Sequence, residues 1–216
     1  LLSLGIAQEL DDESLERQLE AVAQAAIPKT VLIAGLGPDG ATRGFGSGAL
    51  MSEDGYILTC SHVVDIGSKA QVTLADGRSF EAQYLGQNRA QDYALLKIEA
   101  AGLAFFEPRE RPLAVGEWVA ALGHPGGPYL DIQPTFSLGK VRALHRKIPV
   151  QFMDRFYNDA IETDVPIFAG NSGGPLVDME GRLVGINGAI LMIGESSYAT
   201  PITQILAEYA ALARGE

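Results

Sequence analysis

Three polar residues interrupt apolar or glycine-rich segments, and together they could carry out acyl transfer. His62 lies in LTCSHVV, Asp92 precedes the apolar run of QDYALLKI, and Ser172 lies in GNSGGPL. A serine hydroxyl becomes an effective nucleophile when an imidazole takes its proton. A carboxylate then holds the imidazole in the correct tautomer and stabilises the imidazolium. The order His, Asp, Ser along the chain is one of the orders in which such triads occur.

Each of these residues also has an ordinary structural explanation when it is taken alone. A histidine among apolar residues is usually a core histidine with a satisfied hydrogen bond. An aspartate before a strand usually caps a turn, and a serine among glycines usually marks a tight turn. The catalytic interpretation therefore depends on the three residues occurring together.

The glycines around Ser172 are a second indication of chemistry. Residues 170–176, GNSGGPL, contain three glycines and one proline, although glycine is costly to order. An oxyanion needs backbone N–H donors directed at one point, which bulky side chains would obstruct. Gly170 can turn its N–H toward the oxyanion, and Gly173 and Gly174 let the chain turn sharply behind the nucleophile.

The amino-acid composition argues against some classes of binding partner. The 216 residues are 47% hydrophobic, which is enough for a substantial core, and the formal net charge is −11. This charge argues against nucleic acid or an anionic membrane as a partner, because phosphate groups require a basic face. The single cysteine, Cys60, cannot form an internal disulfide, and no apolar run approaches the length of a membrane span.

Helical patterns occur near both ends of the chain. Residues 9–26 carry acids at the front and an apolar stripe of Leu15, Leu19, Val22 and Ala26, and Pro28 ends the pattern. Residues 202–215 return to helical periodicity, with Gly215 as the stop signal. The first residues, LLSLGIA, fit either the remnant of a signal peptide or the ordinary start of a truncated chain.

Between these helices the pattern is that of short strands. Apolar runs alternate with Gly and Asp turns, as is typical of an antiparallel sandwich or barrel. Residues 101–115 are rich in proline and charge, and we interpret them as the connector between two β halves. The runs predicted as strands are 30–36, 46–51, 56–60, 71–75, 80–85, 93–98, 118–123, 139–144, 175–178 and 183–188.

These motifs, in this order, resemble a particular family. GNSGGPLV, with TCSHVV and QDYALLKI upstream, resembles the chymotrypsin-fold serine proteases. Within them, GEWVAALGHPGG, TDVPIFAGNSGGPLVDMEGRLVGINGAIL and YATPITQILAEYAALARGE are similar to segments of the HtrA/Deg proteases. The similarity runs from about Thr30 to the end of the chain. GNSGGPL alone occurs in several protease families, whereas the ordered set is much more specific.

The resemblance implies an all-β fold of two six-stranded antiparallel barrels with an N-terminal and a C-terminal helix. The implied divisions are an arm at 1–28, a first barrel at 29–110, a second barrel at 111–201 and a closing helix at 202–216. His62 and Asp92 would come from the first barrel and Ser172 from the second. The oxyanion hole would use the backbone N–H groups of Gly170 and Ser172, with Asn171 between them.

The resemblance also implies a specificity pocket, lined by Ile167, Ile186, Asn187 and Gly188. No acid occurs at positions 166–169. We therefore expect a small or medium aliphatic residue before the cleaved bond, and not Lys or Arg.

Several residues depart from the family pattern. Digestive relatives have an aspartate where Asn171 stands and begin with Ile-Val-Gly-Gly, so we expect ordering of a loop rather than activation by cleavage. His124 stands where the family usually has asparagine and is interpreted as a turn variant. Cys60 is expected to be a buried packing thiol and His145 a surface residue. HtrA proteins commonly carry a PDZ domain after the closing helix; either it is trimmed here or the protein lacks it.

The predicted function is that of a serine endopeptidase for unfolded or misfolded polypeptides, without a cofactor or metal. The resemblance implies an exported, periplasmic or extracytoplasmic protein and a homo-oligomer, typically a trimer. The alternative is a catalytically silent or gated protein of the same fold, acting as a scaffold, binding or chaperone module. The intact triad and glycine loop favour the enzyme. An esterase is disfavoured because the order Ser, Asp, His that such triads follow along the chain is absent.

Overall fold

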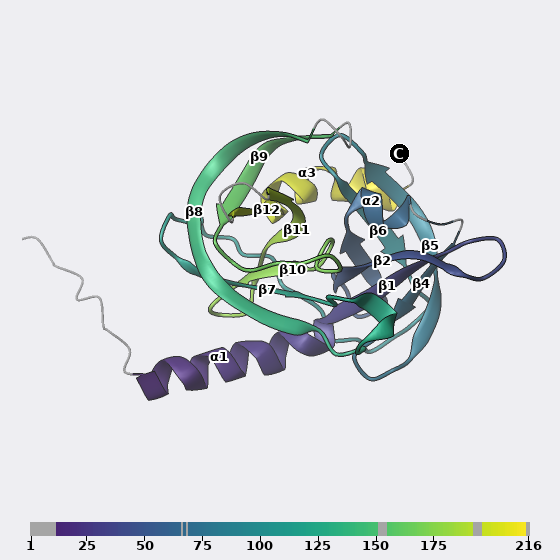
Figure 1. The fold of residues 1–216 in the computed structure, drawn as a ribbon, viewed down its shortest axis with the longest axis horizontal. Helices are drawn as coiled ribbons and strands as arrows, with labels where there is room; N and C mark the ends of the chain where they lie inside the picture. Colours follow the sequence, from purple (N-terminus) through teal and green to yellow (C-terminus); the bar gives the residue numbers. More distant parts are fainter. Residues whose placement is uncertain (1–11, 66, 68, 151–154, 192–195, 215–216) are drawn as a thin grey trace, which may run out of the picture.

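The computed structural model describes residues 12–65, 67, 69–150, 155–191 and 196–214. The strands form two closed antiparallel barrels of six strands each (Figure 1). The predicted fold class is therefore confirmed. Residues 1–11 and 215–216 lie outside the described residues, and with them the possible signal remnant, the start of the predicted helix at 9 and the stop at Gly215.

The first barrel has the strand order β1-β2-β3-β6-β5-β4. Hairpins join β1 to β2, β2 to β3, β4 to β5 and β5 to β6, and the pairings of β3 with β6 and of β1 with β4 close the barrel. Its strands are β1 (Thr30–Leu36), β2 (Thr42–Leu50), β3 (Tyr56–Thr59), β4 (Lys69–Thr73), β5 (Ser79–Asn88) and β6 (Tyr93–Lys97).

The second barrel repeats this arrangement with the order β10-β11-β12-β9-β8-β7. Its strands are β7 (Trp118–Gly123), β8 (Thr135–Val150), β9 (Arg155–Thr163), β10 (Pro175–Asp178), β11 (Leu183–Leu191) and β12 (Ser196–Pro201). β8 is much longer than the apolar run that predicted it, and β9 and β12 had no such run. The backbone pairing of these polar segments, which a hydrophobic pattern does not report, makes them strands.

Short helices and two longer ones complete the fold. α1 (Asp12–Ala26) continues into the 3-10 turn η1 (Ile27–Lys29), and α3 (Ile202–Ala213) follows β12 directly. Two short elements, α2 (Ser61–Val64) and η2 (Gly127–Tyr129), lie in loops. In α1 the predicted stripe is buried only at Val22 and Ala26, because the preceding turns extend past the barrels (Figure 1).

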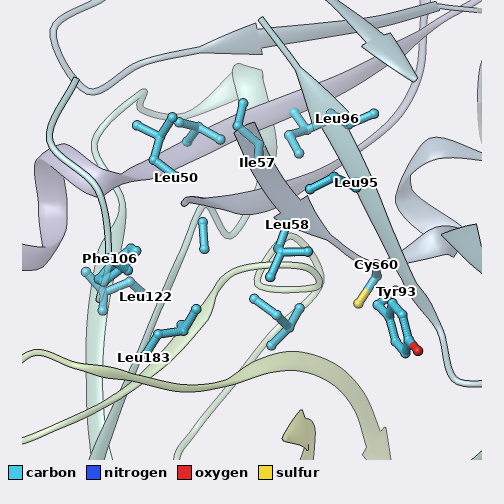
Figure 2. Packing of buried hydrophobic residues seen from close by; sticks show 14 of the residues in the cluster. Leu50, Ile57, Leu58, Cys60, Tyr93, Leu95, Leu96, Phe106, Leu122 and Leu183 are labelled. Carbon is cyan, nitrogen blue, oxygen red and sulfur yellow. The ribbon is translucent and has the colours of Figure 1, made fainter. Parts of the chain in front are cut away.

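A single cluster of buried side chains continues from one barrel into the other. Leu58 and Tyr93 of the first barrel belong to the same cluster as Leu122 and Leu183 of the second, and Phe106 of the connector joins them (Figure 2). α3 packs against β5, β6, β11 and β12 and adds buried side chains to this cluster. Because close-packed interiors deform little, the loops of the two barrels are held in fixed relative positions.

Candidate active site

His62 lies on α2, directly after β3. Cys60 keeps the extended conformation of the strand, and Ser61 begins the helical turn. Ser61 and Val63 are buried on either side, whereas the His62 side chain keeps 18% of its surface exposed. The predicted packing role of Cys60 agrees with its burial and with its Sγ–H contact to the backbone oxygen of Asn187 at 3.2 Å. The ring of His62 is therefore anchored by its neighbours and open toward solvent.

Asp92 is buried and surrounded by hydrogen-bond donors. Its Oδ1 accepts from the Ser61 hydroxyl at 3.0 Å and from the backbone N–H of His62 at 3.1 Å. Its Oδ2 lies 2.7 Å from Nδ1 of His62 and accepts from the Tyr157 hydroxyl at 2.6 Å. Such a set of donors suits an ionised carboxylate, which accepts at both oxygens. This arrangement assigns the proton of the neutral His62 ring to Nδ1 and leaves Nε2 as a base.

The backbone at Asp92 is in an unusual conformation. Its φ is +59°, in the left-handed region that aspartate enters more readily than most residues. The residue stands immediately before β6, so this local turn directs its carboxylate at α2 and away from the strand. A residue keeps such an unfavourable φ where its surrounding contacts hold the backbone in that conformation.

Tyr157 was not recognised from the sequence. It lies on β9 in the second barrel, yet its hydroxyl reaches the carboxylate of Asp92 in the first. Gly188 on β11 leaves the space for it, because a Cβ there would lie 2.6 Å from the Tyr157 hydroxyl oxygen. Nothing in the local sequence FYNDAIET distinguishes this tyrosine from a packing residue.

The backbone of the segment 172–174 is fixed on both sides. The carbonyl oxygen of Ser172 accepts from the N–H of Ser47 on β2 at 2.8 Å. Gly173 donates to the backbone oxygen of Asn187 at 2.7 Å, and the Asn187 side chain donates to the carbonyls of Gly174 and Pro175. Ser172 itself remains partly exposed between these anchors.

This segment lies directly against the part of the chain that carries His62. A Cβ at Gly173, which has a φ of +83°, would collide with Thr59 and Cys60. A Cβ at Gly46 would lie 2.5 Å from Cγ2 of Val63 and 2.8 Å from the carbonyl oxygen of Ser172. The fold therefore brings Ser172 beside α2. In the described structure no hydrogen bond joins the Ser172 hydroxyl to the His62 ring, and such contacts commonly tighten only with substrate bound.

Two backbone donors beside Ser172 are available to a ligand. Within the described residues, the N–H groups of Gly170 and Ser172 have no protein acceptor, whereas the N–H of Asn171 donates to the carbonyl of Phe168 at 2.9 Å. Gly170 has a φ of +107°, which favours glycine. The Asn171 side chain is fully buried, and its amide atoms have no hydrogen-bond partner in this part of the structure.

The four residues predicted to line the pocket differ in exposure. Ile186 and Asn187 are buried, with 1% and 2% of their surface exposed, and Ile186 belongs to the main core cluster. Ile167 retains 8% exposure and packs with Val165 and Ile161. Gly188 is half-buried. Because Ile186 and Asn187 are buried, they can influence the predicted pocket only by supporting the residues that line it.

The other two histidines lie outside this cluster. His145 is exposed, as predicted, and pairs with Asp159 through Nδ1 at 2.6 Å. His124 is buried, and burial lowers its pKa from 6.5 to about 4 despite the nearby charge of Asp131. Its ring contacts Ser47 and the backbone of Ile132.

Comparisons with known proteins agree with this geometry. The model of the trypsin-like peptidase domain matches residues 46–186. A probable periplasmic serine endoprotease, DegP-like, from Halomonas elongata is 40% identical over 149 residues, covering 68% of this chain and 30% of the relative. The putative serine protease HhoA from a Synechocystis species is 39% identical over 176 residues, covering 80% of this chain and 44% of the relative. The chain thus spans less than half the length of these relatives.

A solved structure shows the same similarity in three dimensions. The serine endoprotease from Yersinia pestis superposes with a TM-score of 0.79 at 31% identity, over 91% of this chain and 66% of that one. None of the helices in the described part of the chain has both the length and the hydropathy that a membrane span requires. The chain belongs to the trypsin-like peptidase family, and its two barrels form a protease domain of the HtrA type.

Proposed function

We propose that this domain hydrolyses peptide bonds, with Ser172 as the nucleophile, His62 as the general base and Asp92 as the group that orients the imidazole. The observation that carries the proposal is the 2.7 Å contact between Nδ1 of His62 and Oδ2 of Asp92, beside the glycine-rich segment that contains Ser172. The donors around Asp92 suit an ionised carboxylate, which is the form that stabilises an imidazolium.

The reaction follows from the positions of these groups. Oγ of Ser172 attacks the substrate carbonyl carbon while Nε2 of His62 takes the hydroxyl proton. The N–H groups of Gly170 and Ser172 donate to the oxygen that becomes negatively charged. His62 then gives its proton to the leaving amine, and the ester on Ser172 forms as the peptide bond breaks. Water, deprotonated by His62, hydrolyses this ester and restores the serine hydroxyl.

We infer that substrate binding completes the contact between Ser172 and His62. The backbone of Ser172 is anchored by Ser47 and Asn187, so a rotation of its side chain is a smaller change than a movement of the loop. This proposal differs from the expectation of loop ordering in that the segment is already anchored and only the serine side chain turns. A resting enzyme would then react slowly until a polypeptide binds beside Ser172.

The proposed pocket comprises Ile167, Ile186, Asn187 and Gly188. Only Ile167 and Gly188 keep exposed surface, and no acid is available at positions 166–169 to bind a basic side chain. A small or medium aliphatic residue before the cleaved bond fits these surroundings best. Peptides that differ only at that residue, with Ala, Val, Leu, Lys or Arg, would measure the preference as a ratio of kcat/KM.

The proposed substrates are unfolded or misfolded polypeptides, which can add an extended segment beside a strand near the site. Because the relatives include proteins named periplasmic serine endoproteases, we propose an extracytoplasmic location. We also propose assembly into a homo-oligomer, with a trimer as the first expectation, which light scattering on the purified protein would test.

The activity test compares the wild type with Ser172→Ala. Casein should be cleaved by the wild type and not by Ser172→Ala, with both proteins showing the same far-ultraviolet circular dichroism. A fluorophosphonate probe should label Ser172, and labelling that requires added casein would show a gated site. Equal cleavage by the variant would refute the assignment of the nucleophile. A folded wild type that neither cleaves casein nor reacts with the probe would favour the scaffold alternative.

A further inference from the structure

His124 and Ser47 form a buried polar pair beneath the segment 169–171. Ser47 comes from β2 of the first barrel, and His124 follows β7 of the second. Both residues are buried, with 0% and 1% of their surface exposed. Oγ of Ser47 accepts from the backbone N–H of His124 at 3.0 Å and lies 2.9 Å from its ring Nδ1. The same oxygen donates its proton to the carbonyl of Gly170 at 2.8 Å.

This pair holds the backbone that presents the oxyanion donors. Ser47 contacts the segment twice, through its hydroxyl to the carbonyl of Gly170 and through its N–H to the carbonyl of Ser172. The carbonyl oxygen of His124 packs so closely on Gly170 that no Cβ would fit. The turn after His124 adds a long contact from the N–H of Gly126 to the carbonyl of Ala169 at 3.4 Å. That carbonyl shares a peptide unit with the N–H of Gly170, so its position sets the direction of this N–H.

When the His124 imidazole is neutral, His124 and Ser47 together carry too few side-chain protons to make all of their hydrogen bonds at once. Nε2 of His124 lies 3.0 Å from the carbonyl of Ile132, and a carbonyl can only accept, so the ring proton belongs on Nε2. Nδ1 then needs a donor, and the described residues place the Ser47 hydroxyl there. The carbonyl of Gly170 needs the proton of the same hydroxyl. A neutral His124 therefore competes with Gly170 for the Ser47 proton.

We propose that His124 and Ser47 are positioning residues that set the orientation of the Gly170 peptide groups and thereby the oxyanion hole. The proposal rests on the proposed function, because it assigns the pair a role in that reaction. The Ser47 hydroxyl holds the Gly170 carbonyl when its proton points there, and releases it when the proton turns to Nδ1 of His124. Both side chains are buried, so the pair would act through the backbone of the segment and not by direct contact with a substrate.

An asparagine at position 124 would remove this competition. The δ atoms of asparagine occupy places close to that of Nδ1 in histidine, and its amide nitrogen is a donor. His124→Asn could donate to Oγ of Ser47 and leave the Ser47 proton to Gly170 at all times. A phenylalanine, in contrast, keeps a planar ring and removes both nitrogen contacts. The two variants at one position therefore separate hydrogen bonding from packing.

The experiment measures kcat and KM separately for casein-derived peptide cleavage by Ser47→Ala, His124→Phe and His124→Asn. Losing an oxyanion donor typically lowers kcat by about 10²–10³, and an indirect effect through the carbonyl should lower it by roughly tenfold or more. We expect this loss in Ser47→Ala and His124→Phe with KM little changed, since the interaction acts in the transition state. We expect His124→Asn to retain the wild-type kcat. Fluorophosphonate labelling rates should follow the same order.

Matched controls separate this role from general destabilisation. Thr30→Val removes another buried hydroxyl that donates to a backbone carbonyl, that of Ala26 at 3.0 Å, and this hydroxyl has no contact with the segment 169–171 among the described residues. His145→Asn replaces the exposed histidine of β8. Both controls should keep the wild-type kcat, and thermal unfolding reports the stability of every variant.

Two outcomes would overturn the inference. One is a wild-type kcat in both folded Ser47→Ala and folded His124→Phe. The other is a kcat in His124→Asn as low as that in His124→Phe, which would assign the residue a packing role. Failure of the proposed function itself would look different, because the wild type would then show neither cleavage nor labelling. An independent measurement is nitrogen NMR of the His124 ring, which should show the proton on Nε2 at neutral pH; a proton on Nδ1 would contradict the scheme.

Discussion

The hydroxyl oxygen of Tyr157 lies 2.6 Å from Oδ2 of Asp92, the same carboxylate oxygen that contacts Nδ1 of His62. Tyr157 belongs to the second barrel, whereas Asp92 and His62 belong to the first. The orientation of the proposed base therefore depends on a hydrogen bond between the barrels, in addition to the packing that joins them. A shift of one barrel against the other would reach His62 through this contact.

Removing the Tyr157 hydroxyl should weaken catalysis without abolishing it. Hydrogen bonds to charged groups contribute about 1.5–3 kcal/mol, so Tyr157→Phe should lower kcat/KM by roughly tenfold or more. The physical reason is that the Tyr157 hydroxyl helps to hold Oδ2 of Asp92 in place against Nδ1 of His62. Unchanged kcat/KM in folded Tyr157→Phe would show that the contact is only structural.

Gly188 should act through the same contact. A Cβ there would lie 2.6 Å from the Tyr157 hydroxyl oxygen, so Gly188→Ala should displace that oxygen from Asp92. Its effect on kcat/KM should largely disappear in a background that already carries Tyr157→Phe. Rates for the four proteins of this double-mutant cycle provide the measurement. Fully additive losses would mean that Gly188 acts on the substrate pocket instead.

Neutralising Asp92 should be far more damaging. In a chymotrypsin-type triad, replacing the aspartate by asparagine lowers kcat by about 10⁴, because the imidazole is held in the wrong tautomer. We expect Asp92→Asn to keep the fold and to lose activity on this scale, measured as kcat at neutral pH. A loss below about tenfold would remove Asp92 from the orienting role.

Gly170→Ala should inactivate the domain while most of the fold survives. The φ of +107° is unfavourable for alanine, and the new Cβ would collide with the carbonyl of His124. The segment must then move, and its N–H donors with it. Fluorophosphonate labelling should fall by about 10²–10³, as for loss of an oxyanion donor. Gly181→Ala is a control, because Gly181 also has a positive φ but open space around it.

His124 should make the stability of the protein depend on pH. Burial lowers its pKa from 6.5 to about 4, while Asp131 and the carbonyl of Ile132 oppose the shift. The unfolded chain then binds a proton between these values and the folded chain does not, so stability is complete above about pH 6.5 and falls as the pH drops toward 4. The difference amounts to about 3 kcal/mol. Urea unfolding at pH 7 and pH 4.5 should show a smaller pH dependence in His124→Asn than in the wild type. Equal dependence in the two proteins would contradict the assignment to His124.

The sequence alone indicated those features that depend only on residues close together in the chain. Glycine at 170 and 173 could be expected near a nucleophile because side chains there would obstruct backbone donors and close packing. Apolar runs such as 30–36 marked strands with buried side chains, and β1 has the same bounds. The apolar pattern did not predict the polar strands β9 and β12, because their formation depends on pairing with neighbours distant in sequence.

Tertiary structure decided the contacts between residues that the sequence keeps far apart. Tyr157 and Asp92 are separated by 65 positions, and Ser47 and Gly170 by 123. No pattern within β9 or β2 indicates these pairings, since each depends on how two barrels pack and on which side chains then face each other. The residue types at 62, 92 and 172 indicated a triad because they fit one chemistry. The partners that position them became visible only when the closure of both barrels brought their loops together.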